Sequence, residues 1–480
     1  MLEESIQALN DKKIGESGFY VVGNKIVIYG TTLDELVGAS NEFVNMLNKN
    51  ARLDENKKPV FEIAKDAKIS KVETIAMASL PRPDVKSKLL LCDAGDGSRL
   101  WVAENCTAED FNKYVTDLKN ASFTLYNENQ IYKNNNTNDK TQCNMYATLT
   151  KDDIIVNVWY TVDGCLRITA DQGFDLIPKT TASYQTVSES GLTMVGTGMQ
   201  SELLFFRLVD GRFVVIDGGF YDATAEVLYD ALKAQAPDPN NIKIACWIFT
   251  HSHEDHVGAF RGIAKNYNKL YADTLTIESL MYNFPGAEQE KSPQALYNVG
   301  ASVRGHIAKT FPNITRYKAH PGNELQIANM RIEVLGSHES YIFDKYPEHY
   351  NRCNLMLKIT VDGTVICIEG DTGEDDNNTL AQTYGTYLRC NILQAAHHGG
   401  GGGTVQANLL FAPETVLYVT TESRLVDGRL GETYNQALIN VNKNPNFKEY
   451  VCHNTANTYF SLPYTPGSYK ILNQNPLIKK

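Results

Sequence analysis

The stretch Thr250-His251-Ser252-His253-Glu254-Asp255-His256 decides how this sequence is interpreted. Its last six positions hold three histidines and two acidic residues, in a chain that has ten histidines in all. Neutral imidazole and carboxylate are the ligands that zinc and related divalent ions select. Ordinary surface residues would be scattered along the chain, so this clustering predicts a metal site.

The flanking residues predict that this stretch is the loop between a strand and a helix. The apolar run Ile244–Phe249 precedes it and reads as a buried strand, and Val257–Phe260 begins a helical pattern. A loop at the carboxyl end of a strand is held by the rigid sheet and stays open to substrate.

Three other predicted strands end in residues of the same chemical kind. Val214–Ile216 leads to Asp217, Val365–Ile368 leads to Gly370-Asp371, and Ile392–Ala395 leads to His397-His398. One strand that ends in Asp-Gly would usually be only a turn. Four strand ends that carry ligand-type residues form a constellation, and we expect them to converge.

Composition sets the broad class of the protein. Its 480 residues allow two to four domains, and 42% hydrophobic with 21% charged residues is ordinary for a soluble globular chain. The net charge of −11 disfavours nucleic acid as a partner without excluding it. No apolar run is long enough to span a membrane.

Cysteine usage and the first residues predict a cytoplasmic location. The nine cysteines are scattered and form no C-x-x-C pattern, so we expect reduced thiols rather than disulfides or a zinc ribbon. The first residues show no signal-peptide pattern.

Changes in pattern along the chain divide it into three parts. Residues 1–65 are predicted to form a small α/β segment, with a hairpin around Gly23-Asn24, and residues 66–190 an α+β accessory domain without a catalytic constellation. Residues 191–480 alternate strands and helices and are predicted to be the catalytic domain. Within these parts we expect a strand at 121–126 and a helix at 293–310.

The clustered motifs together resemble the metallo-β-lactamase superfamily. The matching parts are His251-x-His253-x-Asp255-His256, Gly370-Asp371 and His397-His398-Gly399, and the resemblance covers about residues 194–465. Their order is most similar to the soluble domain of ComEC-type competence proteins and related esterases. The resemblance implies an αββα sandwich at the C-terminal side, preceded by an N-terminal α+β accessory region.

The resemblance also implies a role for each motif residue. His251 and His253 would hold a first divalent ion, Asp255 and His256 a second, and the two oxygens of Asp371 would bridge both. Two Zn²⁺ ions are expected, with Mn²⁺ or Fe²⁺ as alternatives. Asp255 and Asp371 are also the candidate catalytic residues, since either is placed to pass on a proton.

Two positions of the ligand set stay less defined. One of His397 and His398 would complete the second metal site, and we favour His397. Asp217 would accept a hydrogen bond from a ligand histidine and so orient its ring.

The superfamily usually has a further histidine before the strand that leads to the Gly-Asp, and this sequence departs from that pattern. The candidates for it are His349 and His338, and neither has the usual Gly-His-Thr neighbours. Asn351 could take this place, and the first metal would then lack a protein ligand. Three more histidines, His306, His320 and His453, are expected to be structural or exposed.

This reasoning predicts a metal-dependent hydrolase that uses a metal-bound hydroxide to cleave a phosphodiester or related ester. Its substrate would be a small-molecule or polymer ester, and the sequence says nothing about oligomeric state. Two alternatives stay open. One is an iron-dependent oxygenase or a thioesterase on the same fold, and the other is a non-catalytic protein that binds a polymer.

Overall fold

The computed structural model describes most of the chain. It covers residues 14–31, 33–72, 75–179, 183–286, 298–340, 350–400, 402–419, 440–452 and 455–474.

The strand before the histidine-rich stretch lies inside a nine-stranded sheet. This strand, β15 (Ile242–Ile248), runs parallel to β14 (Phe213–Asp217) on one side and to β17 (Ser279–Tyr282) on the other. Six of its seven residues are buried, as expected for a parallel strand with both faces covered. The other strands of this sheet are β12 (Gly191–Met194), β13 (Leu203–Arg207), β16 (Leu275–Ile277), β18 (Thr315–Lys318), β26 (Ala456–Ser461) and β27 (Lys470–Gln474).

A seven-stranded sheet packs face to face against the first one. Its order is β19-β20-β21-β22-β23-β24-β25. Ile216 and Ile248 of the first sheet share an apolar core with Ile332 and Ile368 of the second. The strands are β19 (Glu324–Ile327), β20 (Met330–Gly336), β21 (Met356–Val361), β22 (Thr364–Ile368), β23 (Ile392–Gln394), β24 (Thr415–Leu417) and β25 (Glu449–Val451).

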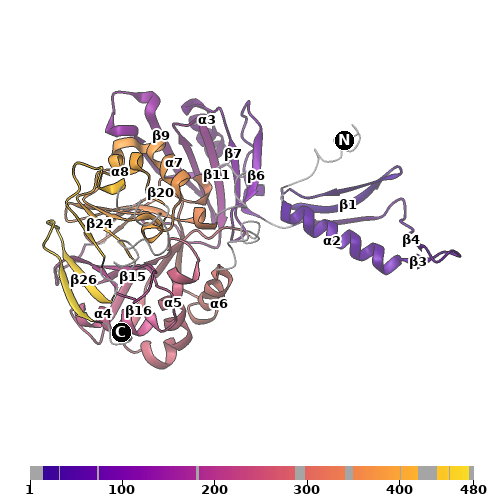
Figure 1. The fold of residues 1–480 in the computed structure, drawn as a ribbon. Helices are drawn as coiled ribbons and strands as arrows, with labels where there is room; N and C mark the ends of the chain where they lie inside the picture. Colours follow the sequence, from indigo (N-terminus) through magenta and orange to yellow (C-terminus); the bar gives the residue numbers. More distant parts are fainter. Residues whose placement is uncertain are drawn as a thin grey trace.

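Helices cover the outer faces of both sheets (Figure 1). On the first sheet lie α4 (Thr224–Gln235), α5 (Glu254–Asn266) and α6 (Gly300–Thr310), whose apolar sides share a core with Trp247. On the second lie α7 (Glu374–Tyr384) and α8 (Val405–Phe411). The expected αββα sandwich is therefore present.

A six-stranded antiparallel sheet from the preceding residues packs beside the sandwich. Helix α3 (Ala108–Asn120) covers one face through Phe111 and Leu118. On the other face Tyr146 joins the core of the second sandwich sheet, and its hydroxyl lies 2.8 Å from that of Tyr384. The strands, in sheet order, are β6 (Leu89–Asp93), β7 (Arg99–Ala103), β11 (Cys165–Gln172), β10 (Ile154–Thr161), β9 (Cys143–Lys151) and β8 (Thr124–Tyr132).

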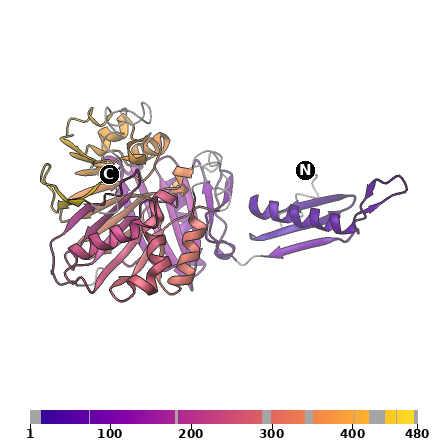
Figure 2. The ribbon, with the colours of Figure 1, turned by 60° about the horizontal axis from the view of Figure 1, so that its bottom comes forward.

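The described residues up to position 72 form a small unit that projects from the rest of the structure (Figure 2). The predicted hairpin is confirmed, since β1 (Glu16–Val22) and β2 (Lys25–Tyr29) pair directly across Gly23-Asn24. This sheet is completed by β5 (Lys68–Val72) and covered by α2 (Leu33–Asn50), and a short ladder joins β3 (Arg52–Leu53) to β4 (Pro59–Val60). The domain boundaries at 65 and 190 stay predictions.

Two secondary-structure predictions need correction. The strand expected at 121–126 is β8, which begins at Thr124 and continues to Tyr132 because β9 pairs along its whole length. The helix expected at 293–310 begins only at Gly300, and residues 293–297 of that prediction lie outside the described residues.

A buried charge cluster joins the six-stranded sheet to the sandwich. His320 lies between two carboxylates, with Nε2 2.7 Å from Asp171 Oδ2 and Nδ1 2.7 Å from Glu339 Oε2. Burial opposes its protonation, but these carboxylates outweigh burial and raise the pKa of His320 to about 9. Lys318 Nζ lies 3.8 Å from Asp171 and donates to the carbonyl oxygens of Ala94 and Gly95. Two cations and two anions therefore balance one another here.

None of the nine cysteines forms a disulfide in the structure, and eight of them are buried. Among the described residues, no helix has the length and apolar character needed to cross a membrane.

Candidate metal centre

Each sequence-predicted ligand that the structure describes lies at the carboxyl end of a strand. Asp217 ends β14, and the histidine-rich stretch follows β15. His253 is the N-cap of α5, so the carboxylates of Glu254 and Asp255 lie in its first turn, where the helix dipole favours negative charge. Asp371 follows β22, and the His397-His398 pair follows β23.

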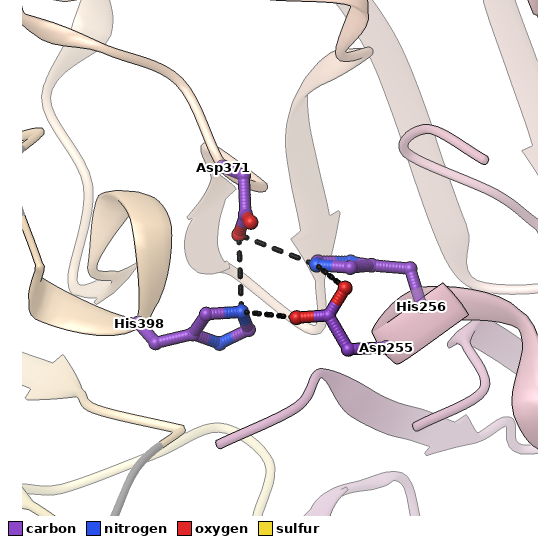
Figure 3. A group of neighbouring side chains, drawn as sticks. All are labelled: Asp255, His256, Asp371 and His398. Atoms are coloured by element: carbon purple, nitrogen blue, oxygen red, sulfur yellow. Dashed lines mark ion pairs between the residues drawn. The ribbon is translucent and has the colours of Figure 1, made fainter. Parts of the chain in front are cut away.

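Four of these side chains converge on one point (Figure 3). Asp255, His256, Asp371 and His398 each offer a ligand atom, all within 4.8 Å of one another. His256 Nε2 and His398 Nε2 each lie 3.3 Å from Asp371 Oδ1. His398 Nε2 also lies 3.4 Å from Asp255 Oδ2. We call this set the second group.

A first group shares the same aspartate. His251, His253 and Asp371 also bring their ligand atoms within 4.8 Å of one another. His251 Nε2 lies 4.0 Å from Asp371 Oδ2, the oxygen that does not face the second group. The two oxygens of one buried carboxylate therefore point to two different sets of imidazoles.

In the second group, the distances of 3.3–3.4 Å between imidazole nitrogens and carboxylate oxygens fit metal ligands better than direct hydrogen bonds. Four ligands at about 2.0–2.2 Å from a tetrahedral cation lie roughly 3.3–3.6 Å apart. Hydrogen bonds between N and O are shorter, at about 2.7–3.2 Å. His251 Nε2 is also buried without a hydrogen-bond partner among the described residues. Burying such a nitrogen costs free energy unless a ligand, such as a metal ion, binds it.

Burial and the charges of the cluster shift the pKa values of its histidines in opposite directions. Burial disfavours the imidazolium form of His398, but Asp371 and Asp255 outweigh it and raise its pKa to about 10. Burial and the neighbouring rings of His256 and His253 lower the pKa of His251 well below its usual value. Without a metal, His398 therefore carries an additional proton near neutral pH, and a metal bound there would displace it.

Asp217 holds the ring of His256 in place. Its Oδ2 lies 2.7 Å from His256 Nδ1 and accepts a hydrogen bond from Thr250 Oγ1 at 2.6 Å, while Oδ1 accepts from the Thr250 amide at 2.8 Å. When Nδ1 of His256 carries the proton donated to Asp217, Nε2 is left with a lone pair that faces the second group.

We expect Asp217→Asn to weaken metal binding by about 10- to 100-fold, the usual range for such partners of ligand histidines. An amide nitrogen beside Nδ1 would favour the tautomer with its proton on Nε2, which cannot bind a metal. Zn²⁺ titration against a competing chelator measures the change. Asp230→Asn, on the exposed side of α4, is the control. Equal affinity in both variants would contradict this role of Asp217.

The Asn354 side chain packs closely against the backbone of Gly370, directly before Asp371. Gly370 has a positive φ of 57°, and a Cβ there would come within 2.5 Å of Asn354 Oδ1. Glycine is therefore required before the aspartate.

The histidine pair lies on strained backbone. His397 and His398 have φ of 49° and 54°, a conformation that costs non-glycine residues about 1–3 kcal/mol each. The His397 amide donates to the Gly370 carbonyl at 2.9 Å, which ties this loop to the one that carries Asp371.

The two histidines differ in burial and in the residues they contact. His398 is fully buried in the second group, whereas His397 lies outside that group with its side chain 37% exposed. His397 Nε2 is 3.8 Å from Asp371 Oδ2 and 3.3 Å from the amide Nδ2 of Asn351. The geometry therefore favours His398 as the ligand, in contrast to the preference for His397 drawn from the sequence.

Of the two candidates for the additional histidine, the structure describes one, His338. His349 lies outside the described residues, as does His453. His338 is buried near Lys318 and His320, and burial lowers its pKa to about 4. Neither metal group among the described residues includes His338. Asn351 lies beside His397, and the first group has three protein ligands among the described residues.

One buried acid in this region was not predicted from the sequence. Glu202 offers a ligand atom within 4.8 Å of those of Asp217 and His256, and its oxygens have no hydrogen-bond partner among the described residues. Burial and Asp217 raise its pKa to about 8. The available signal was an acidic residue directly before the apolar run 203–206 of a strand.

Comparison with known proteins supports the fold. Residues 196–375 match a family model described as Metallo-beta-lactamase superfamily. No curated protein sequence matches this chain.

Similar solved structures are remote. The metallo-β-lactamase fold protein YhfI from Bacillus subtilis is 11% identical, covers 56% of this chain and 99% of its own, and has a TM-score of 0.35. Yeast PDE1 is 10% identical, with 57% and 100% coverage and a TM-score of 0.37. CmlA, a diiron β-hydroxylase from Streptomyces venezuelae, is 10% identical, with 58% and 55% coverage and a TM-score of 0.35. Likenesses this remote say nothing about the reaction.

The family match spans the strands that position Asp217, the histidine-rich stretch and Asp371. The chain contains a domain of the metallo-β-lactamase superfamily.

Proposed function

We propose that this protein is a metal-dependent hydrolase that cleaves a phosphodiester or related ester. One observation carries the proposal: Asp371 offers one oxygen to each of two groups of buried imidazoles. Paired divalent ions about 3.5–4 Å apart, bridged by a carboxylate, are a recurrent arrangement in phosphatases and nucleases.

The two groups of neighbouring ligand atoms support an assignment of residues to each ion. His251, His253 and Asp371 would hold the first ion, and Asp255, His256, Asp371 and His398 the second. Bound there, divalent ions would supply Lewis acidity and lower the pKa of water to near neutrality. The expected ion is Zn²⁺, with Mn²⁺ and Fe²⁺ as alternatives, since imidazole and carboxylate suit all three.

The chain's own residues supply orientation and contacts to the substrate. Asp217 fixes the tautomer of His256. His397 is the more exposed of the paired histidines, and Asn351 orients its ring, so His397 is placed to contact a substrate oxygen. Asp255 is partly exposed and is placed to receive a proton at the carboxylate oxygen that His398 does not face.

The choice of a phosphodiester rests on the motif order shared with ComEC-type proteins, and we propose that subgroup for this chain. The stretches of this sequence that fit the subgroup are Asp217-Gly218-Gly219, Asn351-x-x-Asn354 and His397-His398-Gly399.

Metal analysis combined with a substrate panel tests the proposal. Purified protein is analysed for metals, stripped with a chelator, and reloaded separately with Zn²⁺, Mn²⁺ or Fe²⁺. It is then assayed with bis(p-nitrophenyl) phosphate, p-nitrophenylphosphorylcholine, p-nitrophenyl acetate and a thioester, and for oxygen uptake. We expect turnover of a phosphodiester that the chelator abolishes and metal restores.

Other outcomes would replace the proposal. Thioester cleavage alone, or iron with oxygen uptake, would identify one of the alternative enzymes. A protein that binds no metal and turns over nothing in the panel would favour the polymer-binding alternative.

A further inference from the structure

A cavity of about 420 Å³ lies away from the metal groups, between the six-stranded sheet and the sandwich. Its volume is within the usual range of small-molecule sites, roughly 300–1,000 Å³. The wall comes from β8–β11, from residues 174–179, and from the segment between β18 and β20. It shares no residue with the two metal groups.

A row of uncharged polar side chains lines one side of this cavity. Asn127, Thr148 and Asn157 are direct partners across β8, β9 and β10, so their side chains lie on the same face of the sheet. Asn323 faces them from the sandwich and donates from its amide to Asn157 Oδ1 at 3.1 Å. Thr148 Oγ1 donates to the same oxygen at 3.0 Å, so both of its lone pairs are occupied. A ligand would therefore bond to the remaining amide hydrogens of Asn157 and Asn323 and to the amide of Asn127.

Four of the six charged residues of the wall are paired with one another, and the two others, Asp175 and Lys179, contact a backbone amide and an aromatic ring. Lys318 lies 3.8 Å from Asp171, and Arg331 Nη2 lies 2.7 Å from Glu324 Oε1. Asp175 accepts a hydrogen bond from the amide of Arg316 at 2.8 Å. A charged ligand would have to compete with these pairs after losing its own hydration, whereas a neutral ligand would leave them intact.

Two aromatic rings complete the wall. Lys179 Nζ lies 4.4 Å from the centre of the Tyr126 ring, and the Arg316 guanidinium lies 5.4 Å from that of Phe174. Together with Ile155, Leu176 and Leu325, the two rings provide apolar surface beside the amides. This combination suits a molecule with apolar C–H faces and hydroxyl edges.

We propose that this cavity binds a neutral polyhydroxylated molecule, a mono- or disaccharide. The inference does not depend on the hydrolase assignment, because the walls and the metal groups are separate.

Calorimetric titration of the full chain tests this site. The probes are glucose, N-acetylglucosamine, maltose and cellobiose, compared with glucuronate, glucosamine and adenosine, each up to roughly 50 mM, well above millimolar dissociation constants. The same titrations use Asn157→Leu and, in case that variant fails to fold, Asn127→Leu, whose side chain is half-buried in the wall. Asn45→Leu, exposed on α2, is the matched control.

We expect one-to-one binding of at least one neutral saccharide, weakened tenfold or more by either cavity substitution and unchanged by Asn45→Leu. Binding should persist after chelation, which separates this result from failure of the hydrolase proposal. The proposal is overturned if no neutral saccharide binds saturably, if only a charged sugar or adenosine binds, or if the folded cavity variants bind as well as wild type.

Discussion

Asp371→Asn is expected to lower phosphodiester turnover by roughly three orders of magnitude, or about 4 kcal/mol of transition-state stabilisation. The substitution keeps the size of the side chain but removes the negative charge that both metal groups share. His256 and His398, each 3.3 Å from the same oxygen, would then face a neutral amide. Steady-state kinetics and metal content of the purified variant measure the effect.

The control for this variant is Glu374→Gln, an exposed residue at the start of α7 that lies three positions further on. Circular dichroism establishes that both proteins fold, and Asp371→Ala tests whether volume matters beside charge. A folded Asp371→Asn protein with wild-type metal content and wild-type rates would remove the basis of the proposed centre.

The second large effect separates the two adjacent histidines. We expect His398→Ala to lose the ion of the second group and to reduce turnover about 100-fold or more, since His398 is fully buried among its ligands. We expect His397→Ala to keep both ions and to lower kcat through a lost substrate contact. Metal analysis of each variant distinguishes these results directly.

Each histidine variant serves as the control for the other, because both remove an imidazole from the same strained loop. If His397→Ala loses the metal and His398→Ala keeps it, the preference drawn from the sequence is restored. Equal metal loss in both would instead point to collapse of the loop, which the near-ultraviolet spectrum would show.

The parts of the site that could be predicted from the sequence are those encoded locally. An apolar run followed by closely spaced ligand residues predicts both the strand and the site at its carboxyl end. The positions of His251 and Asp371 after strands could therefore be predicted without knowing which strands pair in the sheet. The hairpin around Gly23-Asn24 was predictable for the same reason, since two residues with turn propensity fix its register.

What could not be predicted depends on contacts between distant residues. The orientation of His397 against His398 is set by left-handed torsions and by a hydrogen bond to Gly370, 27 positions earlier, and neither has a local signature. The length of β8 is set by its partner β9. Glu202 joins the site only because β13 lies beside β14.

The balanced cluster around His320 has a practical consequence for anyone who trims this protein. Expression of the sandwich alone would remove Asp171 and the carbonyl groups of Ala94 and Gly95, and leave Lys318 without those partners. Breaking a buried pair in this way typically costs about 3–5 kcal/mol, a large share of the stability of a domain. Residues 75–179 should therefore be retained in any shortened version, and the sandwich is expected to be insoluble or unstable without them.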